Sequence, residues 1–130
     1  MLVKGIHWVG VCASDFDATT AFYRDVLGLS VRGQGVQSSP ADAGTPFMEL
    51  AAANGDFVEV FGDGLAARDL FRAPMAGFLV EDVGKAREEM ERKGAVFVGP
   101  IGRGGRWEWS YFRTPAGHVH QLLAEIRSRP

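Results

Sequence analysis

The segment HWVGVCASDFDATTAFYRDVLGLSV, residues 7–31, decides the fold, because residues 74–98, PMAGFLVEDVGKAREEMERKGAVFV, repeat its pattern. In each segment an apolar run is followed by an aspartate and then by a helical pattern, and a glycine ends the helical pattern. The aspartates are Asp15 and Asp82, and the glycines are Gly28 and Gly94. Aspartate suits the N-cap of a helix and glycine suits its C-terminus. The repeat therefore predicts two similar modules that each begin with a strand and a helix.

Three extended segments follow each helical pattern, separated by turn residues. They span residues 29–37, 46–52 and 56–61 in the first half, and 95–98, 107–113 and 118–125 in the second. We predict an α+β fold of two βαβββ modules that form a cupped mixed sheet in a single domain. Module one is expected at about residues 5–62, a linker at about 63–73, and module two at about 74–126.

Two finer details of this fold can also be predicted. The helices should pack on the sheet through faces formed by Ala18, Phe22 and Val26 in the first and by Val83, Ala86 and Met90 in the second. The glycine-rich stretch GPIGRGG, residues 99–105, predicts a flexible hairpin loop, since no P-loop lysine follows its glycines.

Composition excludes several classes of partner. The 130-residue chain carries a net charge of −2, and neither sign gathers in a block, so we expect no nucleic acid partner. No apolar run approaches the length of about 18 residues that a membrane span needs. A single cysteine, Cys12, excludes an internal disulfide, and the chain is expected to be cytoplasmic. Cys12 lies in an apolar run, which favours a small buried hydrophobe over a nucleophile.

The order of elements, with the phrases FYRDVLGL (residues 22–29) and YFRTPAGH (residues 111–118), resembles the vicinal oxygen chelate superfamily. This superfamily includes glyoxalase I, extradiol dioxygenases, fosfomycin-modifying enzymes and bleomycin resistance proteins. The resemblance covers about residues 5–125. It implies that the two modules cup one small-molecule pocket and that each supplies two ligands to a metal. Relatives often form homodimers, and we expect a homodimer here.

The family pattern also locates the four metal-ligand positions. One ligand lies seven residues before the aspartate that opens each helix, which gives Trp8 and Met75. The other lies four residues after the turn glycine of each module, which gives Glu59 and Gln121. One carboxylate and one amide are a poor donor set. The resemblance therefore implies a pocket that has lost its metal, and we expect no cofactor, a divalent metal being disfavoured.

Three histidines are candidates for replacement ligands. His7 lies next to Trp8, and it would enter the pocket only if the strand register slipped by one residue. His118 and His120 alternate with Gln121, so they should lie on the helix-covered side of the sheet. All three are expected to be structural.

Aromatic residues surround the single remaining acid. Phe57, Glu59 and Phe61 alternate onto one strand face, so burial should raise the pKa of Glu59 unless a cation pairs with it. The candidate partners are Arg32, Arg103 and Arg106. Trp107, Trp109 and Tyr111 also share a strand face, and the sequence leaves open whether that face lines the pocket or meets the helix.

The leading hypothesis is metal-independent binding of an aromatic or polycyclic small molecule, resembling the drug-sequestering antibiotic-resistance branch of the family, with no catalysis. Its binding residues would be Trp8, Phe57, Glu59, Phe61, Met75, Trp107, Trp109, Tyr111 and Gln121. The alternative is a glyoxalase-like lyase, isomerase or epimerase in which Glu59 is the base and Gln121 orients a carbonyl. A third hypothesis keeps a metal on Glu59, Gln121 and His7, as in metal-dependent glyoxalases or dioxygenases.

Overall fold

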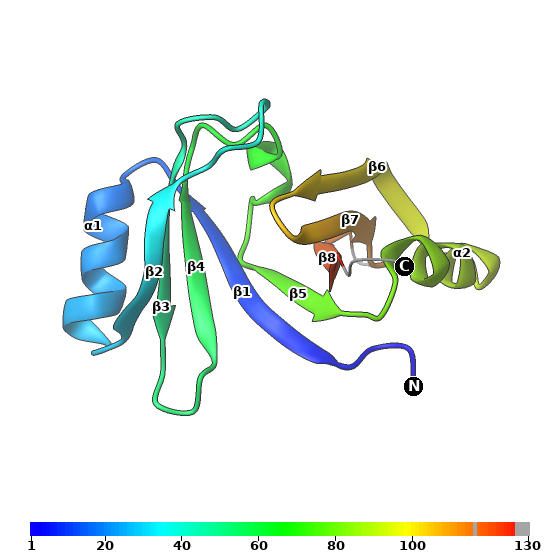
Figure 1. Cartoon of the computed structure of the whole chain (residues 1–130), viewed down its shortest axis with the longest axis horizontal. Coiled ribbons are helices and arrows are strands. Elements are labelled where there is room, and N and C mark those ends of the chain that lie inside the picture. The colour runs from blue at the N-terminus through cyan, green and yellow to red at the C-terminus, as the bar shows by residue number, and fades with distance from the viewer. Residues whose placement is uncertain (116, 127–130) are drawn as a thin grey trace. The chain divides into compact units, whose positions relative to one another are not determined.

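A computed structural model describes residues 1–115 and 117–126, and its contacts divide the chain into two compact units. The first unit is Trp8–Met75. The second unit consists of Met1–His7 and Ala76–Pro130. Each unit carries one main helix against a mixed sheet, so the predicted α+β fold of βαβββ modules is confirmed (Figure 1). Ala116, in the turn that the sequence predicts before the last strand, lies outside the described residues.

The first unit orders its strands β2-β3-β4-β1. These strands are β1 (Gly5–Ala13), β2 (Ser30–Val36), β3 (Pro46–Ala51) and β4 (Phe57–Gly62). Strand β1 runs parallel to β4, whereas β3 is antiparallel to both β2 and β4. Helix α1 (Phe16–Ala21) continues into a π-helical turn, η1 (Phe22–Val26), and a 3-10 turn, η2 (Arg68–Leu70), follows β4.

Helix α1 packs on the sheet through a different face from the one predicted. The buried side is Phe16, Thr20 and Tyr23, which covers Met48, Leu50 and Val60. Phe22 and Val26 are instead 51% and 67% exposed, so the predicted face of Ala18, Phe22 and Val26 is wrong. Thr20 can be buried because its hydroxyl donates to the carbonyls of Phe16 and Asp17, at 2.9 and 3.1 Å. A pattern based on apolar residues does not include such a buried threonine, so it does not predict this face of the helix.

The second unit orders its strands β5-β8-β7-β6. They are β5 (Met75–Leu79), β6 (Val96–Gly104), β7 (Trp107–Arg113) and β8 (Val119–Glu125), with β5 parallel to β8. Helix α2 (Val83–Arg92) begins where Asp82 accepts a hydrogen bond from the amide of Lys85, at 3.0 Å. Its predicted face is confirmed, since Val83 and Ala86 are buried and Met90 packs beside them. No helix in the described part of the chain is long and apolar enough to cross a membrane.

Glycines end both main helical segments, as predicted. Gly28 and Gly94 have φ of 73° and 94°, which favour glycine. The predicted hairpin forms between β6 and β7, but its loop is shorter than residues 99–105, because β6 runs on to Gly104 and the chain turns only at Gly105 and Arg106. The register between β6 and β7 shifts between Val98 and Gly102, and this irregularity accommodates Pro100. Strand β6 is an edge strand, where the missing N–H of a proline is tolerated.

Candidate functional site

Each sheet has one face that its helix does not cover, and we call it the helix-free face of that unit. In the first unit, Val60 and Leu50 lie under α1, so side chains that alternate with them point the other way. Phe57, Glu59 and Phe61 therefore share the helix-free face, as predicted. Glu59 stands opposite Gly10 of β1 and opposite Glu49 of β3. The sheet thus places two carboxyl groups side by side.

Aromatic side chains cover much of this face. Trp8 is 6% exposed, and its ring lies across Gly10, where an added β-carbon would overlap it. The ring of Phe61 meets Trp8 edge-on with centroids 6.2 Å apart. Met75, the other residue predicted at a metal-ligand position of the first strands, is fully buried. Glu59 therefore lies beside Gly10, and the indole ring of Trp8 packs over the backbone of that glycine.

The acid at position 59 is electrostatically unusual. Burial, and secondly the charge of Glu49, raise the pKa of Glu59 to about 8, and Arg32 opposes this shift only in part. Within the described residues Glu59 has no ion-pair partner. Arg32 pairs instead with Glu49, with 3.5 Å between Nε and Oε1. The other two candidate cations, Arg103 and Arg106, pair with Glu108 at 3.2 Å and Glu125 at 3.7 Å.

Sequence reasoning missed Glu49. It lies in the predicted strand of residues 46–52, but nothing in its immediate neighbours marks it as functional. The register between β3 and β4 brings it opposite Glu59, and that register depends on the turn at Ala52–Asp56. Alternation alone could have shown only that Phe47 and Glu49 share a face.

The aromatic residues of the second unit lie on its helix-free face. Ser110 of β7 faces α2 and is hydrogen-bonded to Arg87 at 3.1 Å, so Trp109 and Tyr111 point the opposite way. This resolves the alternative that the sequence left open, because the aromatic face of β7 does not lie under α2. Tyr111 stands opposite Gln121 of β8. Gln121 is 7% exposed, and its Oε1 has no hydrogen-bond partner among the described residues.

The histidines occupy separate positions. His7 packs against Trp107 with ring centroids 4.9 Å apart. His120 contacts Phe78 and Phe112 on the side covered by α2, and it accepts a hydrogen bond from the amide of Ala76 at 3.3 Å. Alternation predicted this side for His120. His118 is exposed just before β8.

The predicted binding residues thus divide into two sets. Trp8, Phe57, Glu59, Phe61 and Met75 belong to the first unit, and Trp107, Trp109, Tyr111 and Gln121 belong to the second. No group of three or more His, Cys, Asp or Glu side chains in the described ranges is arranged to hold a metal ion. Cys12 is partly buried, and burial raises the pKa of its thiol, which disfavours a nucleophilic role.

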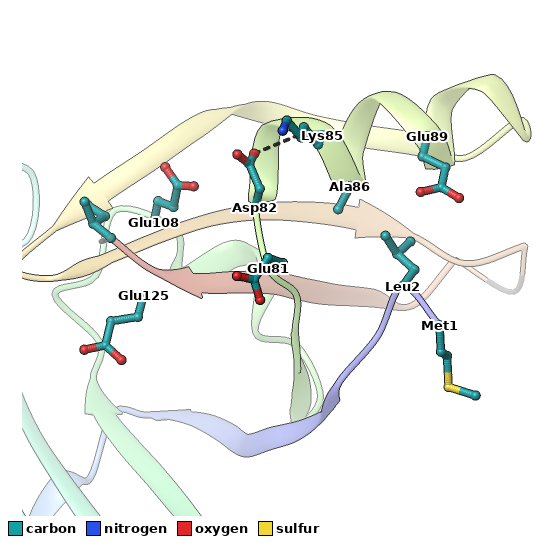
Figure 2. Close-up of a pocket in the computed structure, with 10 residues that line it drawn as sticks. Met1, Leu2, Glu81, Asp82, Lys85, Ala86, Glu89, Glu108 and Glu125 are labelled. Carbon is teal, nitrogen blue, oxygen red and sulfur yellow. Dashed lines mark hydrogen bonds between the residues drawn. The ribbon is translucent and has the colours of Figure 1, made fainter. Parts of the chain in front are cut away.

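A surface cavity of about 540 Å³ lies in the second unit, and none of its lining residues is a predicted binding residue (Figure 2). Apolar side chains and carboxylates line it: Met1, Leu2, Glu81, Asp82, Lys85, Ala86, Glu89, Glu108, Glu125 and Ile126. Its acids already have partners in the same unit, such as Lys4 at 2.7 Å from Glu81.

Comparison with known proteins identifies the family. Residues 5–122 match the model of the Glyoxalase/Bleomycin resistance protein/Dioxygenase superfamily, so the chain belongs to that superfamily. The resemblance noted in the sequence is thereby confirmed. No match was found among curated proteins.

Solved structures give the same fold at low sequence identity. Methylmalonyl-CoA epimerase from Mycobacterium tuberculosis is 18% identical with a TM-score of 0.75, over 97% of this chain and 91% of that one. The Streptomyces coelicolor epimerase, in complex with 2-nitronate-propionyl-CoA, is 18% identical with a TM-score of 0.72, over 96% and 99%. A hypothetical protein from Bacillus halodurans is 12% identical with a TM-score of 0.75, over 97% of each chain.

Proposed function

We propose that the protein is an enzyme that moves a proton to and from a carbon atom next to a carbonyl group, as an epimerase or isomerase does, with Glu59 as the base. One observation carries the proposal: a partly buried glutamate, unpaired among the described residues, has a pKa near 8 beside a second carboxyl group that is paired with Arg32. A buried carboxyl group whose pKa is raised beside a second carboxyl group is typical of acid–base sites. The similarity to epimerase structures is consistent with this choice.

The proposed step needs no redox partner. The Glu59 carboxylate takes the proton of the C–H bond, and the electron pair of that bond moves into an enolate whose negative charge rests on the carbonyl oxygen. The enolate then takes a solvent-derived proton at the same carbon: addition to the face that lost its proton gives exchange, and addition to the opposite face gives epimerisation. A base with a pKa near the working pH is effective in such transfers. Orientation of the carbonyl by Gln121 stays a prediction.

We further propose that this chemistry proceeds without a metal. The two first-strand positions that the family pattern assigns to ligands hold Trp8, whose indole nitrogen is a donor only, and the fully buried thioether of Met75. Glu59 is the one anionic donor among the four positions, and Gln121 adds only a neutral amide. These residues do not fit a tightly bound divalent ion.

Deuterium exchange tests the proposed function. Acyl thioesters, 2-hydroxy ketones and 2-oxo acids are incubated with the protein in D2O, and ¹H NMR follows the signal at the carbon beside the carbonyl. We expect exchange with at least one class, at a rate that rises with pH and levels above the Glu59 pKa of about 8. Glu59→Gln should slow it by about 100-fold or more while ligand binding persists.

The control for this assay is Glu88→Gln, which makes the same chemical change on the exposed side of α2. It should exchange at the wild-type rate. Exchange that survives in Glu59→Gln, or a panel in which no member exchanges, would count against the proposal.

Sequestration of an aromatic or polycyclic molecule, as in drug-binding resistance proteins, is the second candidate. The aromatic residues Trp8, Phe57 and Phe61 beside Glu59 favour it, because flat rings stack on aromatic side chains. A ligand would have to open the packing that leaves these rings 6%, 6% and 9% exposed. Under this function a tight ligand is found by quenching of tryptophan fluorescence and no carbon acid exchanges. Glu59→Gln should then change the affinity by less than about threefold.

We propose that the protein forms a homodimer in the cytoplasm. Three large apolar side chains at the end of the first helical segment, Phe22, Val26 and Leu27, are between 51% and 67% exposed, and such a patch is typical of an interface. Light scattering should give about twice the chain mass of 14.1 kDa. Val26→Glu should give monomers, whereas Val96→Glu, on the exposed β6, should not. A monomeric wild type would exclude this proposal.

A further inference from the structure

Arg32 has neighbours that orient its guanidinium group but leave part of it available. Its central carbon lies 3.9 Å from the centroid of the Phe57 ring, and its Nε lies 3.5 Å from Oε1 of Glu49. The side chain is 44% exposed. No group in the described part of the chain accepts a hydrogen bond from its two terminal nitrogens, Nη1 and Nη2. Their planar edge is the part of a guanidinium that binds a carboxylate with two parallel hydrogen bonds.

A β-bulge in β2 produces this arrangement. Val31 pairs with Leu50, and the register then shifts so that Gly33 pairs with Glu49. Arg32 and Gly33 both lie beside Glu49 as a result. A β-carbon on Gly33 would come within 2.6 Å of the Glu49 carboxylate, so the glycine leaves the space that this carboxylate occupies. Glu49 is therefore held where it faces both Arg32 and Glu59.

The charge on this face limits what can bind. Arg32 pairs with Glu49, and Glu49 stands opposite Glu59 on the neighbouring strand, so the guanidinium group lies near the Glu59 side of this face. Glu49 already offsets one positive charge. A carboxylate adds a single negative charge, whereas a phosphate dianion would bring two next to two glutamates.

We propose that Arg32 binds the carboxylate of the substrate and that the substrate is an organic monocarboxylate whose exchanging C–H bond then faces Glu59. This inference rests on the proton transfer proposed above and names the substrate class for it. Arg32 is a binding residue in this scheme, and Glu49 is a positioning residue that acts through it.

The test uses phenylacetate and its neutral analogue phenylacetamide as probes of the intact protein. ¹H–¹⁵N NMR monitors the Nε–H signal of Arg32 during titration at neutral pH. Phenylacetate should bind and shift that signal. Arg32→Gln should weaken phenylacetate binding by about tenfold or more and leave phenylacetamide binding unchanged. Arg32→Lys should restore part of the loss, because it keeps the charge but not the planar pair of donors.

Arg24→Gln is the matched control, since Arg24 is exposed and pairs with Asp25 at 2.9 Å on η1. It should bind both probes as the wild type does. Equal phenylacetate affinity in wild type and Arg32→Gln, an unmoved Arg32 signal, or no binding of phenylacetate by the wild type would each overturn the assignment.

The exchange assay separates this inference from the function on which it rests. With a carboxylate substrate, Arg32→Gln should raise KM with little change in kcat, and Glu59→Gln should lower kcat. If phenylacetate binding depends on Arg32 but no carbon acid exchanges, the result contradicts the proposed function and supports the carboxylate site. If neutral carbon acids exchange and Arg32→Gln does not change their KM, the result contradicts the carboxylate site and supports the proposed function.

Discussion

Glu59→Gln is expected to stabilise the protein at alkaline pH and to leave its stability almost unchanged near pH 5. The unfolded chain ionises Glu59 near 4.5, and the folded protein ionises it near 8. Between these two values the folded state keeps a proton that the unfolded state has released. The free energy of unfolding of the wild type therefore falls as pH rises through this window, and the fall ends above the folded pKa.

The size of the effect follows from the same two values. Each pH unit contributes about 1.4 kcal/mol, so the window from 4.5 to about 8 contributes at most roughly 5 kcal/mol. Glutamine resembles the neutral acid in shape and does not titrate, so the variant lacks this loss. Urea unfolding near pH 5 and near pH 9 measures the difference between the two proteins.

Glu88→Gln serves as the comparison, because it makes the same change on the exposed side of α2. Its free energy of unfolding should follow the wild type at both pH values. A constant difference between wild type and Glu59→Gln across the whole pH range would mean that Glu59 is ionised in the folded protein. In that case the acid–base role of Glu59 would lose its physical basis.

The sequence predicted the fold well because the fold depends on features that a repeat preserves. Capping aspartates, Gly28 and Gly94, and alternating apolar residues lie in matching places of both halves. Each feature acts over a few residues, so each can be read without the rest of the structure. The helix-covered position of His120 followed from alternation in the same way.

The electrostatic partners could not be predicted in this way. Arg32 was a candidate partner of Glu59. The bulge in β2 and the pairing of β2 with β3 instead place Arg32 beside Glu49, with which it forms an ion pair. Both depend on register, which is set by turns and bulges and not by composition. The face of helix α1 was misjudged for a related reason, since Thr20 is buried only because two backbone carbonyls accept its hydroxyl proton.

Gly10 is required by the packing of Trp8. The six-membered part of the Trp8 ring lies directly over the Gly10 backbone, and the ring is only 6% exposed. A β-carbon at position 10 would overlap three atoms of that ring. A buried indole cannot swing away as an exposed flexible side chain would, because its other surfaces are packed, on one side against Phe61. The ring must therefore move together with its neighbours, or the strand must bend.

Gly10→Ala is accordingly expected to lower the free energy of unfolding by about 3 kcal/mol, as overpacking in a core does. Gly5→Ala is the control in the same strand, since no atom of residues 1–115 or 117–126 outside its chain neighbours lies within 4 Å of the position its β-carbon would take. It should change stability by less than about 0.5 kcal/mol. In a Trp8→Leu background the cost of Gly10→Ala should fall to about 1 kcal/mol or less, because the atoms that clash are gone. An undiminished cost in that background would show that the glycine is needed by the backbone and not by the indole ring. Urea unfolding of the four variants and the wild type decides between these outcomes.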